Sequence, residues 1–203
     1  KGENWTTCEL DKIYTADYYY VKFFDSDNGV IVCGYAKSND TNESSRIYST
    51  SNGGESWDIV GSGPATNIIK GVVYVSSDVG FFCYDYVEGM DSNLYKTDDG
   101  GKTFAKVMLE EQELDSSAAN PQGQETETKT DSGKNGADSS EQLRWGDVYK
   151  EALTPVVDST GIITIYLTQG KNAVYNDGKT AAKYQSSDKG STWKYIGQVE
   201  IKD

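Results

Sequence analysis

Short apolar runs alternate with turn-forming residues along most of the chain. The run "YYYVKFF" passes through "DSDNG" into a second run, "VIVCGY". After a polar loop comes a third run, "RIYST", and a fourth, "WDIV", leaves a tight turn. Tyr, Val and Ile clusters bounded by Gly, Asp and Asn are typical of β-strands joined by hairpins. The pattern therefore predicts four short antiparallel strands.

The same order of elements returns twice more. It appears as "VVYVSSDVG", "FFCYDY", "NLYKT" and "FAKVML", and again as "TPVVDSTG", "IITIYL", "AKYQS" and "WKYIGQVEI". Nearly unbroken apolar runs indicate sheets that are packed on both faces. Four strands in every 45 to 50 residues or so are typical of a β-propeller blade. We expect an all-β fold with blades at 11–61, 62–110 and 143–203, and one strand of another blade at 1–10.

An eight-residue frame joins the third strand to the fourth in each unit. It holds Ser or Thr, then Asp or Asn two positions later, Gly two further on and an aromatic residue three beyond. We call this frame the box, and "KGENW" at the start of the chain fits its second half. The key positions are Thr50, Asn52, Gly54 and Trp57; Thr97, Asp99, Gly101 and Phe104; and Ser186, Asp188, Gly190 and Trp193.

The chemistry of the box indicates a structural role. The Asp or Asn side chain can accept backbone N–H bonds within the turn, and the hydroxyl can tie the turn to the preceding strand. Glycine supplies a backbone conformation that a Cβ would penalise. We expect each box aromatic to be largely buried between neighbouring sheets, and none of these residues to be catalytic.

Repeated at this spacing, the box resembles the Asp-box, or BNR, repeat. That repeat occurs in sialidases, some xyloglucan-degrading glycosidases, sortilin-type receptors and the photosystem II assembly factor family. The resemblance covers residues 1–109 and about 145–203, and it is specific for fold and poor for function. Propellers typically have four to eight blades, so three cannot close a ring. We expect an incomplete ring, completed by further blades of a longer exported protein or by a second copy.

Residues 111–142 break the pattern, because they contain no aromatic and no β-branched aliphatic residue. Such an acidic, low-complexity segment is predicted to be a flexible insertion. After it, the sequence "SSEQLRWGDVYKEALTP" has apolar residues at helical spacing before Pro155. This spacing predicts a short helix within 140–153.

The composition of the chain limits the classes of molecule that it is expected to bind. The 203 residues carry a net charge of −13, which disfavours binding to nucleic acid or anionic lipid. No apolar run approaches the roughly 20 residues of a membrane span. Histidine is absent, which excludes a histidine-based acid, base or metal site. Of three cysteines, Cys33 and Cys83 lie in apolar runs and are predicted to be buried free thiols. We expect no cofactor.

Candidate ligand-binding residues lie in the loops opposite the boxes. Aromatic side chains beside charged groups suit the binding of sugars or peptides, although solvated loops with incidental aromatics are the alternative. The segment "DSDNG" also resembles the opening of a calcium loop, with Asp25 and Asp27 as ligands, but no Glu follows where it is required and a hairpin turn is favoured. The candidate ligand-binding residues are Asp17, Tyr18, Arg46, Trp145 and Tyr175.

The resemblance leaves two functions open. Sialidase activity needs three arginines for the substrate carboxylate, and this chain has only Arg46 and Arg144. We therefore predict a non-catalytic extracellular or cell-surface module that binds a glycan or a protein. The alternative is part of a sialidase-like or xyloglucanase-like glycoside hydrolase whose catalytic residues lie partly outside this chain.

Overall fold

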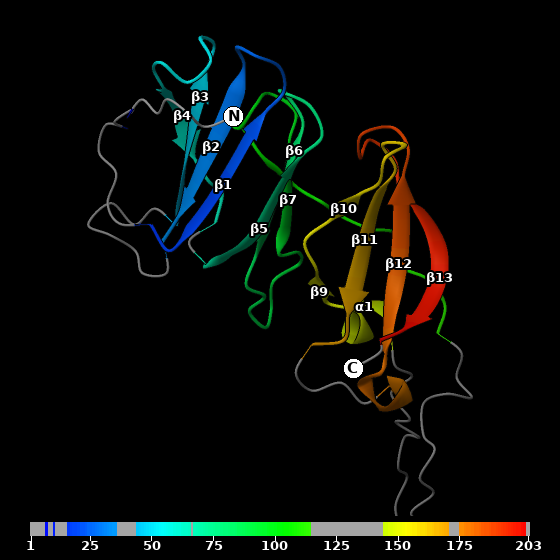
Figure 1. The fold of residues 1–203 in the computed structure, drawn as a ribbon. Helices are drawn as coiled ribbons and strands as arrows, with labels where there is room; N and C mark the ends of the chain where they lie inside the picture. The colour runs from blue at the N-terminus through cyan, green and yellow to red at the C-terminus, as the bar shows by residue number, and fades with distance from the viewer. Residues whose placement is uncertain are drawn as a thin grey trace, which may run out of the picture.

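The computed structural model describes residues 7, 10, 16–35, 44–65, 67–114, 144–170 and 175–201. Three antiparallel sheets follow one another in chain order (Figure 1). The first contains β1 (Tyr18–Phe23), β2 (Gly29–Gly34), β3 (Ser45–Thr50) and β4 (Asp58–Ser62). The second contains β5 (Ile69–Tyr74), β6 (Gly80–Tyr84), β7 (Leu94–Thr97) and β8 (Ala105–Lys106). The third contains β9 (Glu151–Ala152), β10 (Val156–Val157), β11 (Ile163–Thr168), β12 (Thr180–Ser186) and β13 (Lys194–Glu200).

The described helices are one α-helical turn, α1 (Trp145–Val148), and one 3-10 turn, η2 (Tyr175–Gly178). Neighbouring strands of the sequence pair within each sheet, except that β9 pairs with β11. Among the described residues the three sheets do not close into a ring. The predicted all-β class, with three antiparallel blades in an incomplete ring, is therefore confirmed. The partial blade predicted at 1–10 lies outside the described residues, apart from positions 7 and 10.

A short helix lies within the predicted region 140–153, but it is limited to α1, and residues 151–152 form a strand instead. Residues 140–143 lie outside the described residues. Tyr149 is extended, with φ −101° and ψ 97°, and it ends α1 after four residues. Ala152 then pairs with Leu167 of β11 as part of β9. Pro155, which has no N–H, separates β9 from β10, so the first strand of the third sheet is split. Pairing with β11 overrides the local helical spacing.

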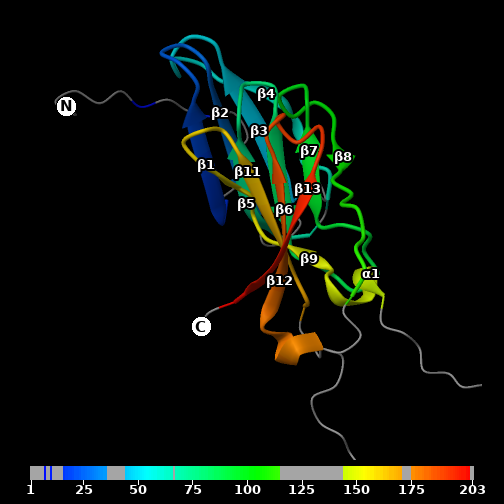
Figure 2. The same cartoon turned by 90° about the vertical axis from the view of Figure 1, so that its right-hand side faces the viewer.

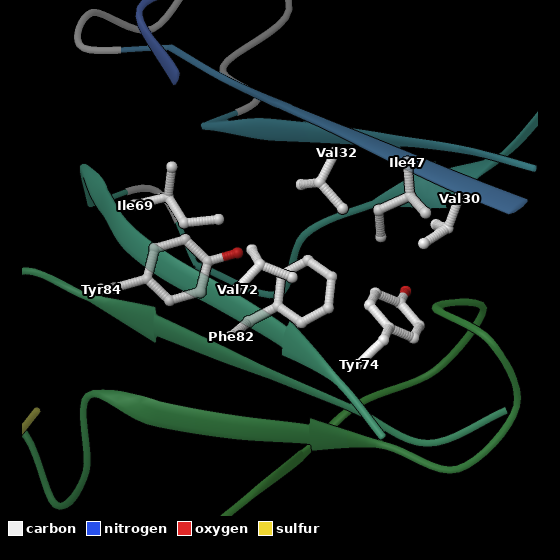
Figure 3. Close-up of a cluster of buried hydrophobic side chains, with 8 residues drawn as sticks. All are labelled: Val30, Val32, Ile47, Ile69, Val72, Tyr74, Phe82 and Tyr84. Atoms are coloured by element: carbon white, nitrogen blue, oxygen red, sulfur yellow. The ribbon is translucent and has the colours of Figure 1, made fainter. Parts of the chain in front are cut away.

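A hydrophobic layer joins the first sheet to the second (Figure 3). Valine and isoleucine side chains of β2 and β3 face aromatic side chains of β5 and β6 across this layer. These residues are 0–4% exposed, so the layer is a continuous core. Its members are Val30, Val32, Ile47, Ile69, Val72, Tyr74, Phe82 and Tyr84.

Side chains of β1 also satisfy the backbone of β5 across this interface. The Tyr18 hydroxyl accepts a bond from the Val72 N–H at 3.1 Å, and the Tyr20 hydroxyl accepts one from the Tyr74 N–H at 3.1 Å. The Lys22 ammonium donates to the Tyr74 carbonyl at 2.6 Å. β5 is an edge strand, and edge strands leave such groups unpaired unless something covers them.

A second hydrophobic layer joins the second sheet to the third. Phe81 and Cys83 of β6 pack there with Ile163 and Ile165 of β11. Burial raises the pKa of the Cys83 thiol to about 12, and burial of Cys33 raises the pKa of its thiol to about 11. Both cysteines are free and buried, as predicted, whereas Cys8 lies outside the described residues.

The box turns form a repeated hydrogen-bond network. Asp99 Oδ1 accepts the N–H groups of Lys102 at 3.0 Å and Thr103 at 2.9 Å, and the Thr103 hydroxyl donates to Asp99 Oδ2 at 2.6 Å. The Thr97 hydroxyl donates to Asp99 Oδ1 at 2.8 Å and accepts the Gly101 N–H at 2.8 Å. These bonds close the turn locally, so the box residues have a structural role in this fold.

The other two boxes repeat this network with small changes. Asp188 takes the place of Asp99 in the third sheet, with the Thr192 hydroxyl donating to it at 2.6 Å. In the first sheet the corresponding residue is Asn52, whose amide donates a hydrogen bond to the Ser56 hydroxyl at 2.9 Å, whereas the two aspartates accept one from a Thr hydroxyl. Gly190 has φ +77°, and a Cβ there would lie 2.5 Å from the Phe81 ring. Glycine is therefore required at this position both by conformation and by the neighbouring sheet.

The box aromatics Trp57, Phe104 and Trp193 are of intermediate burial, and each packs against a hydrophobic cluster, so they are mostly but not fully buried. Trp57 meets Phe23 edge to face at 5.8 Å between ring centroids, and Phe104 meets Phe82 at 4.9 Å, both within their own sheets. Trp193 alone of the three contacts a ring of the preceding sheet, at 6.0 Å from Phe81. The boxes lie in the turns at the ends of the sheets, between β3 and β4, β7 and β8, and β12 and β13.

Candidate functional site

A groove lies between the second and third sheets, at the end opposite the boxes. Its volume is about 450 Å³. Three segments line it: the β6–β7 loop at 86–93, the chain leaving β8 at 107–111, and the segment 144–152 that contains α1. Figure 2 shows α1 beside the chain that leaves β8, and Leu109 of that chain packs against the α1 cluster.

The β6–β7 loop is held in shape by its own bonds. The Met90 N–H donates to the Val87 carbonyl at 3.1 Å, and the Met90 sulfur accepts the Val87 N–H at 3.4 Å. Asn67 donates to the Asp85 carbonyl at 3.0 Å and to the Met90 sulfur at 3.3 Å. Gly89 has φ +92°, which the turn requires. The loop wall of the groove is therefore preformed.

The floor of the groove depends on Asn93, which is 1% exposed. Its amide nitrogen donates to the Tyr84 carbonyl at 2.8 Å and to the Ala152 carbonyl at 2.9 Å. Its amide oxygen accepts the Ala152 N–H at 2.8 Å. A side chain of the second sheet thus satisfies both backbone groups of a residue in the third, and it fixes the two walls of the groove relative to each other.

The chain leaving β8 completes the second wall. The Tyr184 hydroxyl donates to the Glu110 carbonyl at 2.7 Å, and Leu114 packs against the cluster around α1. A Cβ at Gly146 would lie 2.6 Å from a carboxylate oxygen of Glu111. Residues 111–114 are therefore part of the folded structure, although they belong to the segment predicted to be a flexible insertion. Residues 115–142 lie outside the described residues.

Charged side chains line the rim in pairs. Lys150 contacts Glu88 at 2.8 Å across the groove, and this bond raises the pKa of Lys150. Arg144 contacts Asp147 at 3.1 Å. Asp91 contacts Lys106 at 2.8 Å, and this bond lowers the pKa of Asp91. Four carboxylates and two cations belong to the lining, so it is acidic: Glu88, Asp91, Glu111 and Asp147 against Arg144 and Lys150.

The structure divides the five predicted ligand-binding residues into two groups. Asp17, Tyr18 and Arg46 lie at one end of the first sheet, where β1 and β3 begin. Asp17 is exposed, the Tyr18 hydroxyl is engaged with β5, and Arg46 is 8% exposed. Trp145 and Tyr175 share a cluster on the third sheet. The five residues therefore do not form one site.

Trp145 and Tyr175 are core residues, so their assignment as ligand platforms is wrong. They are 4% and 1% exposed. Trp145 packs 4.6 Å from Tyr149 and 5.3 Å from Tyr195, measured between ring centroids. Their loop positions in the sequence indicated exposure, but the third sheet folds over them. Trp145 still borders the groove from below.

Sequence reasoning missed most of the residues that build the groove. Asn93 ends a loop and carries no motif, and its bonds reach Ala152, 59 positions away. A signal was nevertheless present, because the chain has only two methionines, Met90 and Met108, and both line the groove. Methionine is common at surfaces that adapt to a ligand.

The segment resembling a calcium loop forms a hairpin turn. Asp25 Oδ1 accepts the N–H groups of Asp27 at 2.8 Å and Asn28 at 2.7 Å. The Asn28 amide donates to both carboxylate oxygens, at 3.0 and 2.9 Å, and these bonds lower the pKa of Asp25. Both oxygens are thus engaged within the turn. Among the described residues, no group of three or more Cys, Asp or Glu side chains is placed to hold a metal ion.

Comparison with known proteins finds little. No family model matches the chain, and no curated protein matches it. The crystal structure of a GH74 enzyme from Niastella koreensis is similar, with a TM-score of 0.39 and 16% sequence identity. The match covers 82% of this chain and 19% of that enzyme, so this chain spans a small part of its length. In the part of this chain that the structure describes, no helix is long and apolar enough to cross a membrane.

Proposed function

We propose that this chain is a non-catalytic binding module and that its groove takes an extended segment of another protein. The observation that carries the proposal is the construction of the groove. Its loop wall is held by internal hydrogen bonds, its two walls are joined by the buried Asn93 amide and its rim is charged, and such preformed sites bind ligands without large rearrangement. An extracellular or cell-surface location belongs to the same proposal, and it rests on the resemblance of the boxes to the Asp-box repeat.

The groove suits a protein segment better than a sugar. Sugar stacking needs an exposed aromatic ring, but Trp145 and Tyr149 are 4% and 3% exposed and pack against each other. Tyr86, which is half-buried, is the one other aromatic residue of the groove lining. Met108, in contrast, is 64% exposed at the groove and offers an adaptable apolar contact. The acidic lining and the net charge of −13 favour a segment with basic side chains beside its apolar anchor.

The state of the carboxyl groups supports a non-catalytic role. Hydrolysis of a glycosidic bond needs one carboxyl group with a raised pKa to act as the acid. At the groove, the hydrogen bond from Lys106 lowers the pKa of the Asp91 carboxyl group, which is opposite to what an acid catalyst needs. Among the described residues, every carboxyl group whose pKa departs clearly from its ordinary value has it lowered.

A parallel screen against a peptide array and a glycan array tests this proposal. We expect binding to peptides that combine an apolar residue with Lys or Arg, and none to glycans. Met108→Lys should weaken peptide binding at least tenfold, about 1.4 kcal/mol, because it places a charge at the apolar contact. The matched control is Val156→Lys, at a position of β10 that is 59% exposed and outside the groove lining.

Three results would count against the proposal. Selective binding to glycans would indicate that the groove takes a sugar and not a protein segment. Equal loss of binding in Met108→Lys and Val156→Lys would move the site away from the groove. Turnover of a chromogenic glycoside, abolished by replacing one Asp or Glu, would show an enzyme.

A further inference from the structure

Most of the negative charge in the groove lining is already neutralised by ion pairs. Three of its four carboxylates each contact a cation of this chain at 2.8 to 3.1 Å: Glu88, Asp91 and Asp147. Glu111 is the fourth, and within the part of the chain that the structure describes no cation is paired with it. A cation brought by a ligand therefore meets the least competition at Glu111.

The backbone on both sides of Glu111 is held in place. The Tyr184 hydroxyl donates to the Glu110 carbonyl at 2.7 Å. Leu109 and Leu114 pack against the hydrophobic cluster that contains Trp145 of α1. These contacts lie within three positions of Glu111 in either direction. The carboxylate therefore stands on an anchored wall of the groove.

The place of the carboxylate itself depends on Gly146, which also lines the groove. A Cβ at Gly146 would lie 2.6 Å from Glu111 Oε1 and 3.4 Å from Glu111 Cδ, so a larger residue would displace the carboxylate. Gly146 lies inside α1 and does not have a positive φ, so the backbone conformation does not require glycine there. Glycine is also unfavourable inside a helix. What this glycine provides is the space that the Glu111 carboxylate occupies.

An exposed apolar contact lies close to Glu111 on the same wall. Met108 lines the groove, is 64% exposed and precedes Glu111 by three positions. Three residues of chain span at most about 11 Å. An extended ligand advances about 3.3 Å per residue. The two contacts therefore match an apolar side chain and a cationic side chain within three positions of each other.

Arginine suits this arrangement better than lysine. Its planar guanidinium presents donors in a fork that fits both oxygens of a carboxylate, and it is more weakly hydrated than an ammonium group. Its aliphatic stem can also lie along apolar surface, which Met90 and Met108 offer in the groove.

We propose that Glu111 determines the specificity of the groove by binding an arginine side chain within three positions of the ligand's apolar anchor. This inference rests on the proposed function, because it names the chemistry of the same ligand. The other three carboxylates contribute less, since a cation of the ligand would first have to displace a Lys or Arg side chain of this chain.

Two peptides that differ in a single charge test this proposal. The probe is Gly-Ser-Leu-Ser-Ser-Arg-Ser-Gly with both ends blocked, and its counterpart carries citrulline, which keeps the shape of arginine without the charge. Titrations followed by two-dimensional NMR measure both Kd values. We expect the arginine peptide to bind about two- to fivefold more tightly, as is usual for a partly exposed ion pair. This preference should shrink as the salt concentration rises.

Variants of the protein assign the preference to one carboxylate. Glu111→Gln should abolish it and leave the affinity for the citrulline peptide unchanged. Gly146→Ala should also reduce it, because it displaces the carboxylate without changing the charge of the protein. The matched control is Glu110→Gln, which removes the same charge one position away and outside the lining, and it should keep the preference. Circular dichroism confirms that each variant is folded.

The control also covers an indirect effect through Tyr184. Burial raises the pKa of Tyr184 to about 12, and the charges of Glu110 and Glu111 both add to this rise. An effect transmitted through Tyr184 would therefore appear in both Glu→Gln variants, whereas direct contact with arginine would appear in Glu111→Gln alone.

The outcomes separate this inference from the proposed function. Equal affinity for the two peptides, with both weakened by Met108→Lys, would overturn the role of Glu111 and leave the groove as a protein-binding site. A preference for arginine that survives Glu111→Gln would assign the contact to another carboxylate and overturn the inference in the same way. Absence of binding by either peptide at millimolar concentration would overturn both the proposed function and the role of Glu111.

Discussion

Replacing Asn93 by alanine should destabilise the whole protein, because this side chain joins two sheets. Its amide makes three hydrogen bonds of 2.8 to 2.9 Å, one to Tyr84 in its own sheet and two to Ala152 in the next. It is 1% exposed, and Ala152 is 4% exposed. In Asn93→Ala the three backbone groups lose their partner in a place that water reaches poorly.

The magnitude follows from the groups left unpaired. A buried N–H or carbonyl without a partner costs about 1 to 3 kcal/mol. The Ala152 carbonyl keeps a weaker contact, because the Cys83 thiol donates to it at 3.2 Å. Two backbone groups are then left without a hydrogen-bond partner and the third keeps a weaker one. We therefore expect the free energy of unfolding to fall by about 3 to 5 kcal/mol. That is a large fraction of the roughly 5 to 15 kcal/mol by which domains are stable.

Urea denaturation followed by tryptophan fluorescence measures this loss. The control is Asn67→Ala, which removes a comparable amide bond to the Asp85 carbonyl at a half-buried position. Because water can replace that bond, we expect a loss of about 1 kcal/mol or less in the control. If Asn93→Ala were no more destabilising than Asn67→Ala, the two sheets would not depend on this amide, and the account of the groove floor would fail.

Two further predictions concern the boxes and the insertion. Hydrogen bonds from Thr103 and Thr192 lower the pKa of the Asp99 and Asp188 carboxyl groups in the folded state. These two carboxylates therefore stabilise the fold at pH values above the ordinary carboxyl pKa near 3.9, and this stabilisation is lost as the pH falls through the lowered pKa. The double variant Asp99→Asn, Asp188→Asn imitates Asn52 of the first box. In urea titrations its free energy of unfolding should fall less between neutral and acid pH than that of the unaltered protein. An equal fall in both proteins would assign the effect to other carboxylates. Replacing residues 115–142 by a short Gly/Ser linker should leave the melting temperature nearly unchanged, since each doubling of loop length changes closure entropy by only about 0.6 kcal/mol, while extending the deletion to 111–114 should lower it because Leu114 packs on the core. A large drop on removing 115–142 alone would show that this segment contributes to the fold.

Turns whose hydrogen bonds join residues a few positions apart could be predicted from the sequence. The Thr97 and Asp99 bonds span at most four positions, and so do those of Asp25 in the hairpin turn. The strand order also follows from local signals, because short hairpins pair neighbouring runs. For this reason the sequence determined the three sheets, their antiparallel order and the geometry of the boxes.

Features that depend on contacts between distant segments were decided only by the tertiary structure. Tyr175 lies in a loop of the sequence, but packing beneath the third sheet buries it, and residues 151–152 leave their helical pattern because β11 offers them a partner. The groove exists because Asn93 reaches Ala152. Burial and long-range pairing are properties of the assembled sheets. The sequence of a single strand specifies which side chains alternate, while only the packed structure decides which of the two faces is covered.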